Sequence, residues 1–369
     1  MKFTCLQENL AKGINTVSRA VPAKSPLPIT THILIETVPG GLKLSATNLD
    51  TTITTLVPAS IEETGSITIP AKLLRDFVAT LSPSTITGHL EDNVLHLSSQ
   101  KTKSKFNGVS ASEFPAIPTM PEEGDFIELD PNLFSYAISH VAFASANDEA
   151  RPVFSGIYLN LEDGELTVAA CDGFRLAEKK LKIENTKNDL KAIIPAKTLA
   201  EIAKIFAGSE EPIKFVLNSN ENLALFQSGD TLVASRILSG DYPDYKRIIP
   251  QETTISAEFA AEELLEAVKL TNLFSTEATS AIKMKLNPDG NIVLTSATQE
   301  TGEHESDIEA QITGGELELA FNSKYLLDLL SNVKSERFKI ETNGNLTPCI
   351  FVASDHEGLL NIIMPMQIT

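Results

Sequence analysis

The sequence repeats itself three times, and this repetition limits the possible folds more than any other feature. Three segments align on a common anchor residue: Pro70 in SITIPAKLLRDFVATL, Pro195 in KAIIPAKTLAEIAKIF and Asn322 in ELELAFNSKYLLDLLSNV. Apolar residues follow each anchor at positions +4, +7 and +11, which is the spacing of one face of an amphipathic helix. Each copy is therefore predicted to contain such a helix at the same place.

Other features recur in the same register. A strand-like run precedes each of these helices, and every copy closes on an aromatic residue or Met before Pro, at Phe114, Tyr242 and Met364. Each copy also opens on a helical pattern, seen near Leu10 in the first and from Glu262 in the third. A repeat of about 120 residues is too long for a solenoid and has the size of a domain. The expected domains span residues 1–121, 122–250 and 251–369.

Each domain is expected to mix helices with strands. Between the two helices of a copy lie runs in which apolar and polar residues alternate, such as ILIETV and TITTLV, with turn residues between them. Such alternation is typical of half-buried strands, so the fold class is α+β, with sheets covered on one side by helices. With 369 residues, of which 42% are apolar, the chain is long enough for an ample core in every domain.

The overall charge and the cysteines restrict the class of protein further. The formal net charge of −19, taken alone, argues against a nucleic-acid partner, although it says nothing of how the charges are distributed. Cys5, Cys171 and Cys349 are widely spaced and include no CxxC pair, so neither a disulfide framework nor a zinc site is expected. The N-terminus lacks the apolar core of a signal peptide and no run is long enough to span a membrane, which predicts a cytoplasmic protein.

A basic residue occupies one fixed position of the repeated helix. Position +2 after the anchor lies opposite the apolar stripe on a helical wheel. It holds Lys72, Lys197 and Lys324, while Arg75 and Lys204 share the outward half of the first two helices. Two interpretations stay open: the lysines face phosphates, or they are solvated and pair with an acid four residues later. Those acids are Asp76, Glu201 and Asp328.

No sequence motif of catalysis or cofactor binding is present. The chain contains no P-loop, dinucleotide-binding, zinc-protease or serine-hydrolase motif, and its six His are scattered without metal-ligand spacing. Neither a cofactor nor a metal ion is therefore expected. An enzyme could use Asp172, Asp244 and Arg175 as acids and anion clamp, but Asp172 with Gly173 is first of all a turn dipeptide. A turn is the favoured interpretation.

The middle copy carries large side chains that the other copies lack. Phe174, Arg175 and Leu176 follow the turn, whereas the matched segments TNLDTTI and ATQETGE carry Thr, Gln and Glu. The segments DYPDYKRIIP and NIIMPMQIT show a similar excess of apolar and Arg residues. Flexible Met beside such side chains suits a surface that accepts several partners. An ordinary core between domains is an equally good interpretation of the same pattern.

Taken together, the triplication, CDGFRLA, DYPDYKRIIP and the terminal MPM resemble the bacterial β sliding clamp family along the whole chain. The resemblance implies three tandem copies of the DNA-clamp domain, with two helices each lining a ring hole and antiparallel sheets outside. It implies a head-to-tail homodimer that encircles double-stranded DNA whatever its sequence and tethers the replicative DNA polymerase for processive synthesis. Such a clamp is not an enzyme and acts by raising an effective concentration.

The resemblance also implies a pocket between the second and third domains, where the polymerase, the clamp loader and repair proteins insert a short linear motif. The matching positions are Phe154, Cys171, Gly173, Phe174, Arg175, Leu176, Pro243, Arg247, Ile248, Pro348, Ile362, Met364 and Met366. Two positions depart from the family. Phe174 stands where His is usual, and Gln367, Ile368 and Thr369 end the chain where Arg-Leu is common. Both departures bear on which motif the rim of the pocket prefers.

Two further surfaces follow from the resemblance. The DNA-facing residues would be Lys24, Lys72, Arg75, Lys197, Lys204 and Lys324. Asp148 and Glu149 stand where a polar DNA-facing loop is expected. The dimer seam would pair Phe106 of one chain with Leu273 and Phe274 of the next. The alternative function is a three-domain protein-interaction adaptor that shares the pocket but does not encircle DNA.

Overall fold

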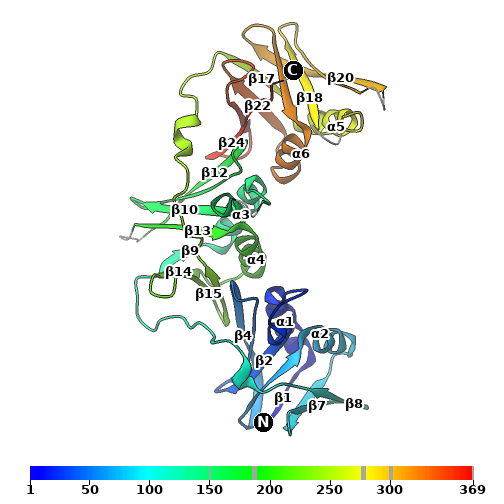
Figure 1. Cartoon of the computed structure of the whole chain (residues 1–369), viewed down its shortest axis with the longest axis vertical. Coiled ribbons are helices and arrows are strands. Elements are labelled where there is room, and N and C mark those ends of the chain that lie inside the picture. The colour runs from blue at the N-terminus through cyan, green and yellow to red at the C-terminus, as the bar shows by residue number, and fades with distance from the viewer. Residues whose placement is uncertain (149–150, 185–188, 276–279, 299–301, 368–369) are drawn as a thin grey trace. The chain divides into compact units, whose positions relative to one another are not determined.

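The computed structural model describes residues 1–148, 151–184, 189–275, 280–298 and 302–367 (Figure 1). The chain forms two compact units. The first comprises Met1–Asn132 and Glu201–Ile237, and the second comprises Leu133–Ala200 and Leu238–Thr369. The boundary between the units therefore falls inside the middle repeat, one part of which belongs to each unit.

The first unit is built on a twelve-stranded antiparallel sheet. Its strands are β1 (Lys2–Leu6), β2 (His32–Val38), β3 (Gly41–Thr47), β4 (Thr51–Glu63), β5 (Ser66–Pro70), β6 (Thr85–Glu91), β7 (Val94–Ser99), β8 (Thr102–Asn107), β9 (Ile127–Leu129), β14 (Ile213–Asn218), β15 (Leu223–Ser228) and β16 (Thr231–Arg236). The main path runs β8-β7-β6-β1-β4-β16-β15-β14-β9, and β3 leads from β4 to β2 and β5. Helices α1 (Gln7–Val17) and α2 (Ala71–Thr80) pack on each other, and α1 also packs on β4.

The second unit has a twelve-stranded antiparallel sheet of its own. Its strands are β10 (Gly156–Glu162), β11 (Glu165–Cys171), β12 (Arg175–Lys182), β13 (Leu190–Pro195), β17 (Ile255–Ala260), β18 (Ala281–Asn287), β19 (Asn291–Thr298), β20 (Gly302–Thr313), β21 (Leu317–Asn322), β22 (Arg337–Thr342), β23 (Cys349–Ala353) and β24 (Leu359–Ile363). The helices are α3 (Pro131–Val141), α5 (Ala261–Asn272) and α6 (Ser323–Asn332), and α4 (Ala196–Phe206) begins here. Strand β12 pairs with β24, which joins the middle repeat to the third.

The repeated helices begin where the sequence predicts. Strands β5, β13 and β21 end at Pro70, Pro195 and Asn322, and α2, α4 and α6 each begin at the next residue. Asn322 caps α6, because its side-chain oxygen accepts the backbone N–H of Lys324 at 2.9 Å. The +4 residues Leu74, Leu199 and Leu326 are at most 1% exposed. The +4 position of the apolar stripe is thus buried in all three copies, as the spacing requires.

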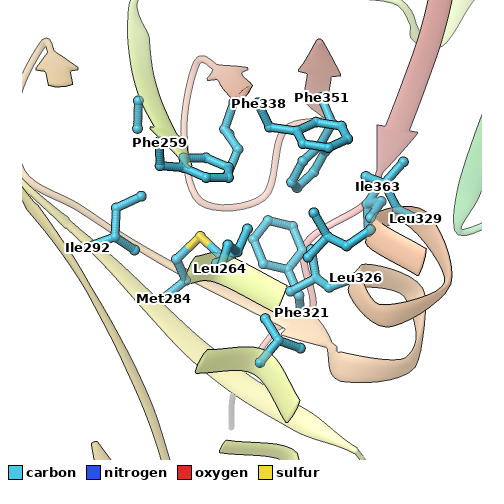
Figure 2. Packing of buried hydrophobic residues seen from close by; sticks show 14 of the residues in the cluster. Phe259, Leu264, Met284, Ile292, Phe321, Leu326, Leu329, Phe338, Phe351 and Ile363 are labelled. Carbon is cyan, nitrogen blue, oxygen red and sulfur yellow. The ribbon is translucent and has the colours of Figure 1, made fainter. Parts of the chain in front are cut away.

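The core of the third repeat shows how the helices and the sheet share one apolar interior (Figure 2). Phe259, Phe321, Phe338 and Phe351 enter it from four strands, and Leu264 enters it from α5. All five side chains have no exposed area. Burial of a large apolar side chain contributes about 1.5–3 kcal/mol, so this cluster fixes α5 and α6 on the sheet.

The expected α+β class is therefore confirmed, with antiparallel sheets and two helices in each of three tandem copies. Among the described residues, every helix is too short or too polar for a membrane crossing.

Candidate functional site: a middle-repeat pocket and basic helix faces

The segment from Asp172 to Arg175 forms a tight turn between β11 and β12. The Asp172 carboxylate accepts the backbone N–H of Phe174 at 2.9 Å and that of Arg175 at 3.0 Å. Gly173 has φ +95°, in the left-handed region where a side chain would be strained. The favoured turn interpretation is confirmed, and the turn makes the Phe174 side chain protrude.

Arg175 does not act as a free anion clamp. Its side chain is 6% exposed, Nε donates to Asp172 at 3.0 Å, and Nη1 donates to Asp328 at 2.6 Å. The guanidinium also lies over the ring of Tyr325, 4.6 Å from its centroid. Because both carboxylates and the guanidinium are already paired, an enzyme that uses Asp172 as an acid and Arg175 as a clamp receives no support from this geometry.

A cavity of about 190 Å³ adjoins the turn. We call it the middle-repeat pocket. Its lining comes from the 3₁₀ turn Pro152–Ser155, the end of β11, the Asp172 turn, the 3₁₀ turn Tyr245–Ile248 and β24 with the residues after it. The lining residues are Phe154, Cys171, Gly173, Phe174, Arg175, Pro243, Asp244, Tyr245, Ile248, Ile362 and Met364. Most of these side chains are apolar, and the lining suits apolar anchors of a short peptide.

A packed layer of tyrosines supports the floor of this pocket. The Tyr242 hydroxyl accepts the backbone N–H of Cys171 at 2.8 Å, and its ring stacks on Tyr158 at a centroid distance of 5.0 Å. The Tyr245 hydroxyl donates to the buried Glu178 carboxylate at 2.5 Å. Burial raises the pKa values of Cys171, Tyr242 and Tyr245. These groups therefore stay protonated near neutral pH and serve as structure rather than as nucleophiles.

The rim of the pocket is exposed and apolar. Phe174 is 55% exposed and Ile248 44%, and Phe174 stacks loosely on Tyr325 with ring centroids 6.4 Å apart. The backbone N–H of Met364 donates to the carbonyl of Phe174 at 2.8 Å, which fastens the C-terminal segment to the turn. An aromatic ring held in this way at an opening is a typical anchor point for a partner.

The structure brings nine of the thirteen predicted pocket residues to this cavity and leaves four outside its lining: Leu176, Arg247, Pro348 and Met366. Leu176 is 1% exposed and packs in the cluster beneath the floor. Arg247 is exposed and pairs with Asp244 at 2.7 Å. The backbone N–H of Met366 donates to the carbonyl of Ala320. Ile368 and Thr369 lie outside the described residues.

Sequence reasoning missed two lining residues, Asp244 and Tyr245. Tyr245 begins a 3₁₀ turn and is 6% exposed. The sequence DYPDYKRIIP could have indicated this position. An aromatic residue two positions after Pro243, in a segment that is otherwise mostly exposed, indicates a turn that packs on the protein.

A matched cavity of about 260 Å³ lies where the first repeat meets β15 and β16 of the middle repeat, and we call it the counterpart pocket. Its lining residues are Thr47, Leu49, Asp50, Thr52, Pro115, Ala116, Ile117, Pro118, Glu221, Leu223, Ala234 and Arg236. In the repeat alignment Thr47, Leu49 and Asp50 take the places of Cys171, Gly173 and Phe174. The counterpart pocket therefore has a carboxylate where the middle-repeat pocket has a protruding aromatic ring.

The fixed-position lysines are exposed in all three copies. The interpretation that they pair with the acid four residues later is wrong among the described residues, because each acid binds a different cation. Asp76 pairs with Arg75 at 3.2 Å, and Asp328 pairs with Arg175. Glu201 pairs with Arg19 at 2.5 Å and Lys204 at 2.9 Å. The ion pairs of these three acids therefore do not involve Lys72, Lys197 or Lys324.

The remaining basic candidates differ in how free they are. Lys24 is exposed in the segment before the 3₁₀ turn Pro28–Thr31. Arg75 and Lys204 are also exposed, but each is neutralised in part by its ion pair with Asp76 or Glu201. Asp148 is exposed, and Glu149 lies outside the described residues.

The three predicted seam residues do not share one environment. Phe106, on the edge strand β8, is only 3% exposed and packs edge-to-face on Phe77 with centroids 5.1 Å apart. Leu273 is 69% exposed, and Phe274 is half-buried and stacks on His304 at 5.2 Å. Phe106 therefore already has a use within its own chain, since it completes the packing of α2 on the sheet.

Three tandem copies of one α+β domain, with a lysine exposed at one position of the repeated helix, define the class of DNA clamps. Family models of the DNA polymerase III beta subunit match the chain in order, the N-terminal domain at residues 1–118, the central domain at 128–244 and the C-terminal domain at 246–367. The chain belongs to the DNA polymerase III beta subunit family, the sliding clamps, which are non-catalytic subunits of a replicative polymerase.

Individual relatives match the chain over its full length and their own. The chain is 31% identical to the beta sliding clamp of Synechococcus elongatus and 30% identical to that of Halalkalibacterium halodurans, with 100% of both chains covered in each case. A crystal structure of the DNA polymerase sliding clamp from Bacillus subtilis superposes with a TM-score of 0.94 at 28% identity, and that of the Thermotoga maritima beta subunit with 0.92 at 27%. Both structural matches also cover 100% of each chain. The resemblance inferred from the motifs is thereby confirmed.

Proposed function

We propose that the protein forms a head-to-tail homodimer that closes into a ring around double-stranded DNA and holds the replicative polymerase at its template. The observation that carries the proposal is the state of Lys72, Lys197 and Lys324. All three are exposed at one helix position, and the acids beside them bind other cations. A chain with a net charge of −19 thus presents unneutralised cations on one repeated surface. Weak attraction that ignores sequence is sufficient for a protein held by topology.

In this arrangement the domains would span residues 1–121, 122–250 and 251–369, and two chains would supply six. The helices would line the hole, with Lys24 as an additional cation. Arg75 and Lys204 would contribute less, because Asp76 and Glu201 already offset their charge. A cytoplasmic location fits three buried free thiols, at Cys5, Cys171 and Cys349, because reduced cysteines are usual there.

Retention on closed DNA tests the ring. The protein, loaded by a clamp loader onto nicked circular DNA, should stay bound through gel filtration at moderate salt. Linearising the DNA with a restriction enzyme should release it, because a ring slides off a free end. Equal retention on circular and linear DNA would support the alternative, an adaptor that shares the partner pocket without encircling DNA, and would defeat the ring.

We also propose that the middle-repeat pocket receives short linear motifs of the polymerase, the clamp loader and repair proteins. The support is its apolar lining, the protruding Phe174 and the contrast with the counterpart pocket. Arg175 and Leu176 would hold the wall from beneath. Arg247, Pro348 and Met366 would act at its margin, outside the cavity itself.

The two pockets supply a matched pair of variants. Ile248 and Leu49 are exposed apolar residues, at 44% and 45%, that line the middle-repeat and counterpart pockets respectively. Ile248→Glu should abolish binding of a fluorescent clamp-motif peptide in an anisotropy titration, whereas Leu49→Glu should leave the affinity unchanged. The opposite ranking would move the peptide site to the first repeat.

The dimer seam is proposed to join β8 of one chain to the segment around Leu273 and Phe274 of the next. As an edge strand, β8 offers unpaired backbone groups to a neighbour, and Leu273 offers a large exposed side chain. Phe106 would then stiffen β8 from within rather than form the apolar contact itself.

A further inference from the structure

The hairpin of β6 and β7 brings three potential metal ligands together, namely His89, Glu91 and His96. Two residues, Asp92 at φ 47° and Asn93 at φ 64°, connect the strands. Positive φ at both central positions is the signature of a type I′ turn, which matches the twist of the strands and fixes their register. In that register His89 lies directly opposite His96.

These two histidines and Glu91 share the exposed face of the hairpin. His89 and Glu91 are two residues apart on β6, so they point to the same side, while Ile86 and Gly88 face the core. The imidazole rings of His89 and His96 stack with centroids 4.5 Å apart. Nε2 of His96 lies 3.9 Å from a Glu91 carboxylate oxygen.

One ligand atom from each of the three residues lies within 4.8 Å of the other two. Zinc binds imidazole nitrogen at about 2.0–2.1 Å, so adjacent ligand atoms of a tetrahedral site are about 3.3 Å apart. The two ring planes are 29° apart, so one imidazole must also turn about its side-chain bonds to point its nitrogen at the same ion. His89 and Glu91 are exposed and have room to turn. A site of two imidazoles and a carboxylate favours zinc over magnesium or calcium, because imidazole nitrogen suits zinc and the other two ions prefer oxygen ligands.

We propose that His89, Glu91 and His96 form a zinc site, with water as the fourth ligand. Two lysines lie opposite the histidines, and their positive charges should reduce the zinc affinity only in part. Lys2 lies opposite His89 on β1, but its ammonium is bound to Glu62 at 2.6 Å. Lys105 lies opposite His96 on β8 and is exposed, so solvent screens its charge. A bound ion would cross-link β6 and β7 beside the edge strand.

The test is zinc titration of the metal-free full-length protein by calorimetry, repeated with Co²⁺ for the visible absorption of a tetrahedral site. We expect one ion per chain at this site. His89→Gln and His96→Gln should each weaken zinc binding at least about tenfold. Loss of a residue that only supports a metal ligand already costs about 10- to 100-fold, and loss of a ligand itself should cost at least as much. Affinity should also fall as the pH is lowered, because protons compete for the same nitrogens.

A second pair of neighbouring histidines provides the matched control. His140 and His356 have ring centroids 5.0 Å apart in the second unit. The double variant His140→Gln/His356→Gln should keep wild-type zinc affinity, whereas His89→Gln/His96→Gln should lose the site. Without metal, the melting temperature of the His89→Gln/His96→Gln variant should equal that of the wild type, and added zinc should raise only the latter. Unchanged zinc affinity in the His89→Gln/His96→Gln variant would overturn the proposal.

Discussion

Arg175 donates to Asp328 at 2.6 Å, and this contact ties the strand after the middle-repeat turn to the repeated helix of the third repeat. The same guanidinium donates to Asp172, which itself holds the turn closed. The wall of the middle-repeat pocket therefore depends on a buried cation that is paired within the chain. The contact also explains why Lys324 is unpaired, since the acid four residues after it faces Arg175.

Removal of the Arg175 guanidinium should lower the stability of the second unit. In Arg175→Met the Asp172 carboxylate, which is 10% exposed, loses its charged partner. Breaking a buried ion pair from one side typically costs about 3–5 kcal/mol. We expect the free energy of unfolding of the second unit to fall by about 3 kcal/mol, measured by urea unfolding. Asp328→Asn should cost less, because Asp328 is 32% exposed and the Asp172 contact survives. Equal losses in both variants would contradict this ranking.

Phe174 should behave in the opposite way. Its ring is more than half exposed and contacts Tyr325 only loosely, so Phe174→Ala should leave the melting temperature nearly unchanged. An exposed aromatic anchor at an interface commonly contributes about 2 kcal/mol or more to binding. Peptide affinity should therefore fall about 30-fold. Phe174→His provides the control, because His keeps a planar ring and should retain most of the affinity. A large stability loss in Phe174→Ala would show that the ring is part of the core.

The elements that the sequence predicted are those that local spacing determines. The stripe at Leu74, Leu199 and Leu326 follows from helical geometry alone, and the Asp172-Gly173 turn follows from the conformational freedom of Gly. Comparison of the repeats singled out Phe174, because the matched turns of the other two copies carry no large side chain there. It left open whether the ring is exposed or buried, and the structure shows it 55% exposed.

The features that the sequence did not predict depend on contacts between distant segments. The packing of Phe106 on Phe77 could not be predicted, because Phe77 lies on a helix that meets β8 only in the folded protein. The acids near the fixed lysines looked like their partners, yet Glu201 binds Arg19, which is 182 residues away in sequence. His89 and His96 become neighbours only through a turn whose register depends on two residues with positive φ. Spacing along the chain carries none of this information.

The three fixed-position lysines should set the salt dependence of DNA binding. Each lysine that contacts a phosphate contributes about 0.9 to the slope of log K against log salt concentration. Replacing Lys72, Lys197 and Lys324 by Gln should reduce the slope by about 2–3 if all three reach the backbone. The measurement is equilibrium binding to a DNA duplex at several salt concentrations.

A matched control removes the same charge from strands. Lys43, Lys180 and Lys283 lie one in each repeat and are paired with Glu36, Glu165 and Glu318. Replacing these three by Gln changes the net charge equally but should leave the slope nearly unchanged. If both triple variants reduce the slope alike, net charge rather than a defined DNA surface controls binding.

His140 should make the second unit sensitive to acid. Burial lowers its pKa first of all, and the nearby His356 and Lys179 lower it further, although Nδ1 donates to the carbonyl of Tyr136 at 2.7 Å. A His in the unfolded chain has a pKa of about 6.5, so the unfolded state binds more protons as the pH falls below that value. The stability from neutral His140 should be complete above about pH 6.5 and lost progressively toward pH 5.

Urea unfolding at pH 7.5, 6.5 and 5.5 measures this loss. His140→Gln should flatten the pH dependence of the wild-type midpoint without abolishing it. His32, whose pKa burial also lowers, lies in the first unit, so His32→Gln should flatten the pH dependence of that unit and leave that of the second unit unchanged. A steeper dependence in His140→Gln would mean that the assigned direction of the pKa shift is wrong.

Substitution of Leu273 should weaken the dimer, whereas substitution of Phe106 should destabilise the fold of the first unit. Leu273 is 69% exposed, so Leu273→Asp removes little packing within the chain and should leave the melting temperature unchanged. It places a charge in the proposed contact, and sedimentation velocity should show monomers at concentrations where the wild type is dimeric. Phe106→Ala should instead unfold the first unit more easily, by about 3–5 kcal/mol, because it opens a cavity beside Phe77. A dimer that persists in Leu273→Asp would refute this seam, whereas a stable monomer in Phe106→Ala would return that ring to the interface.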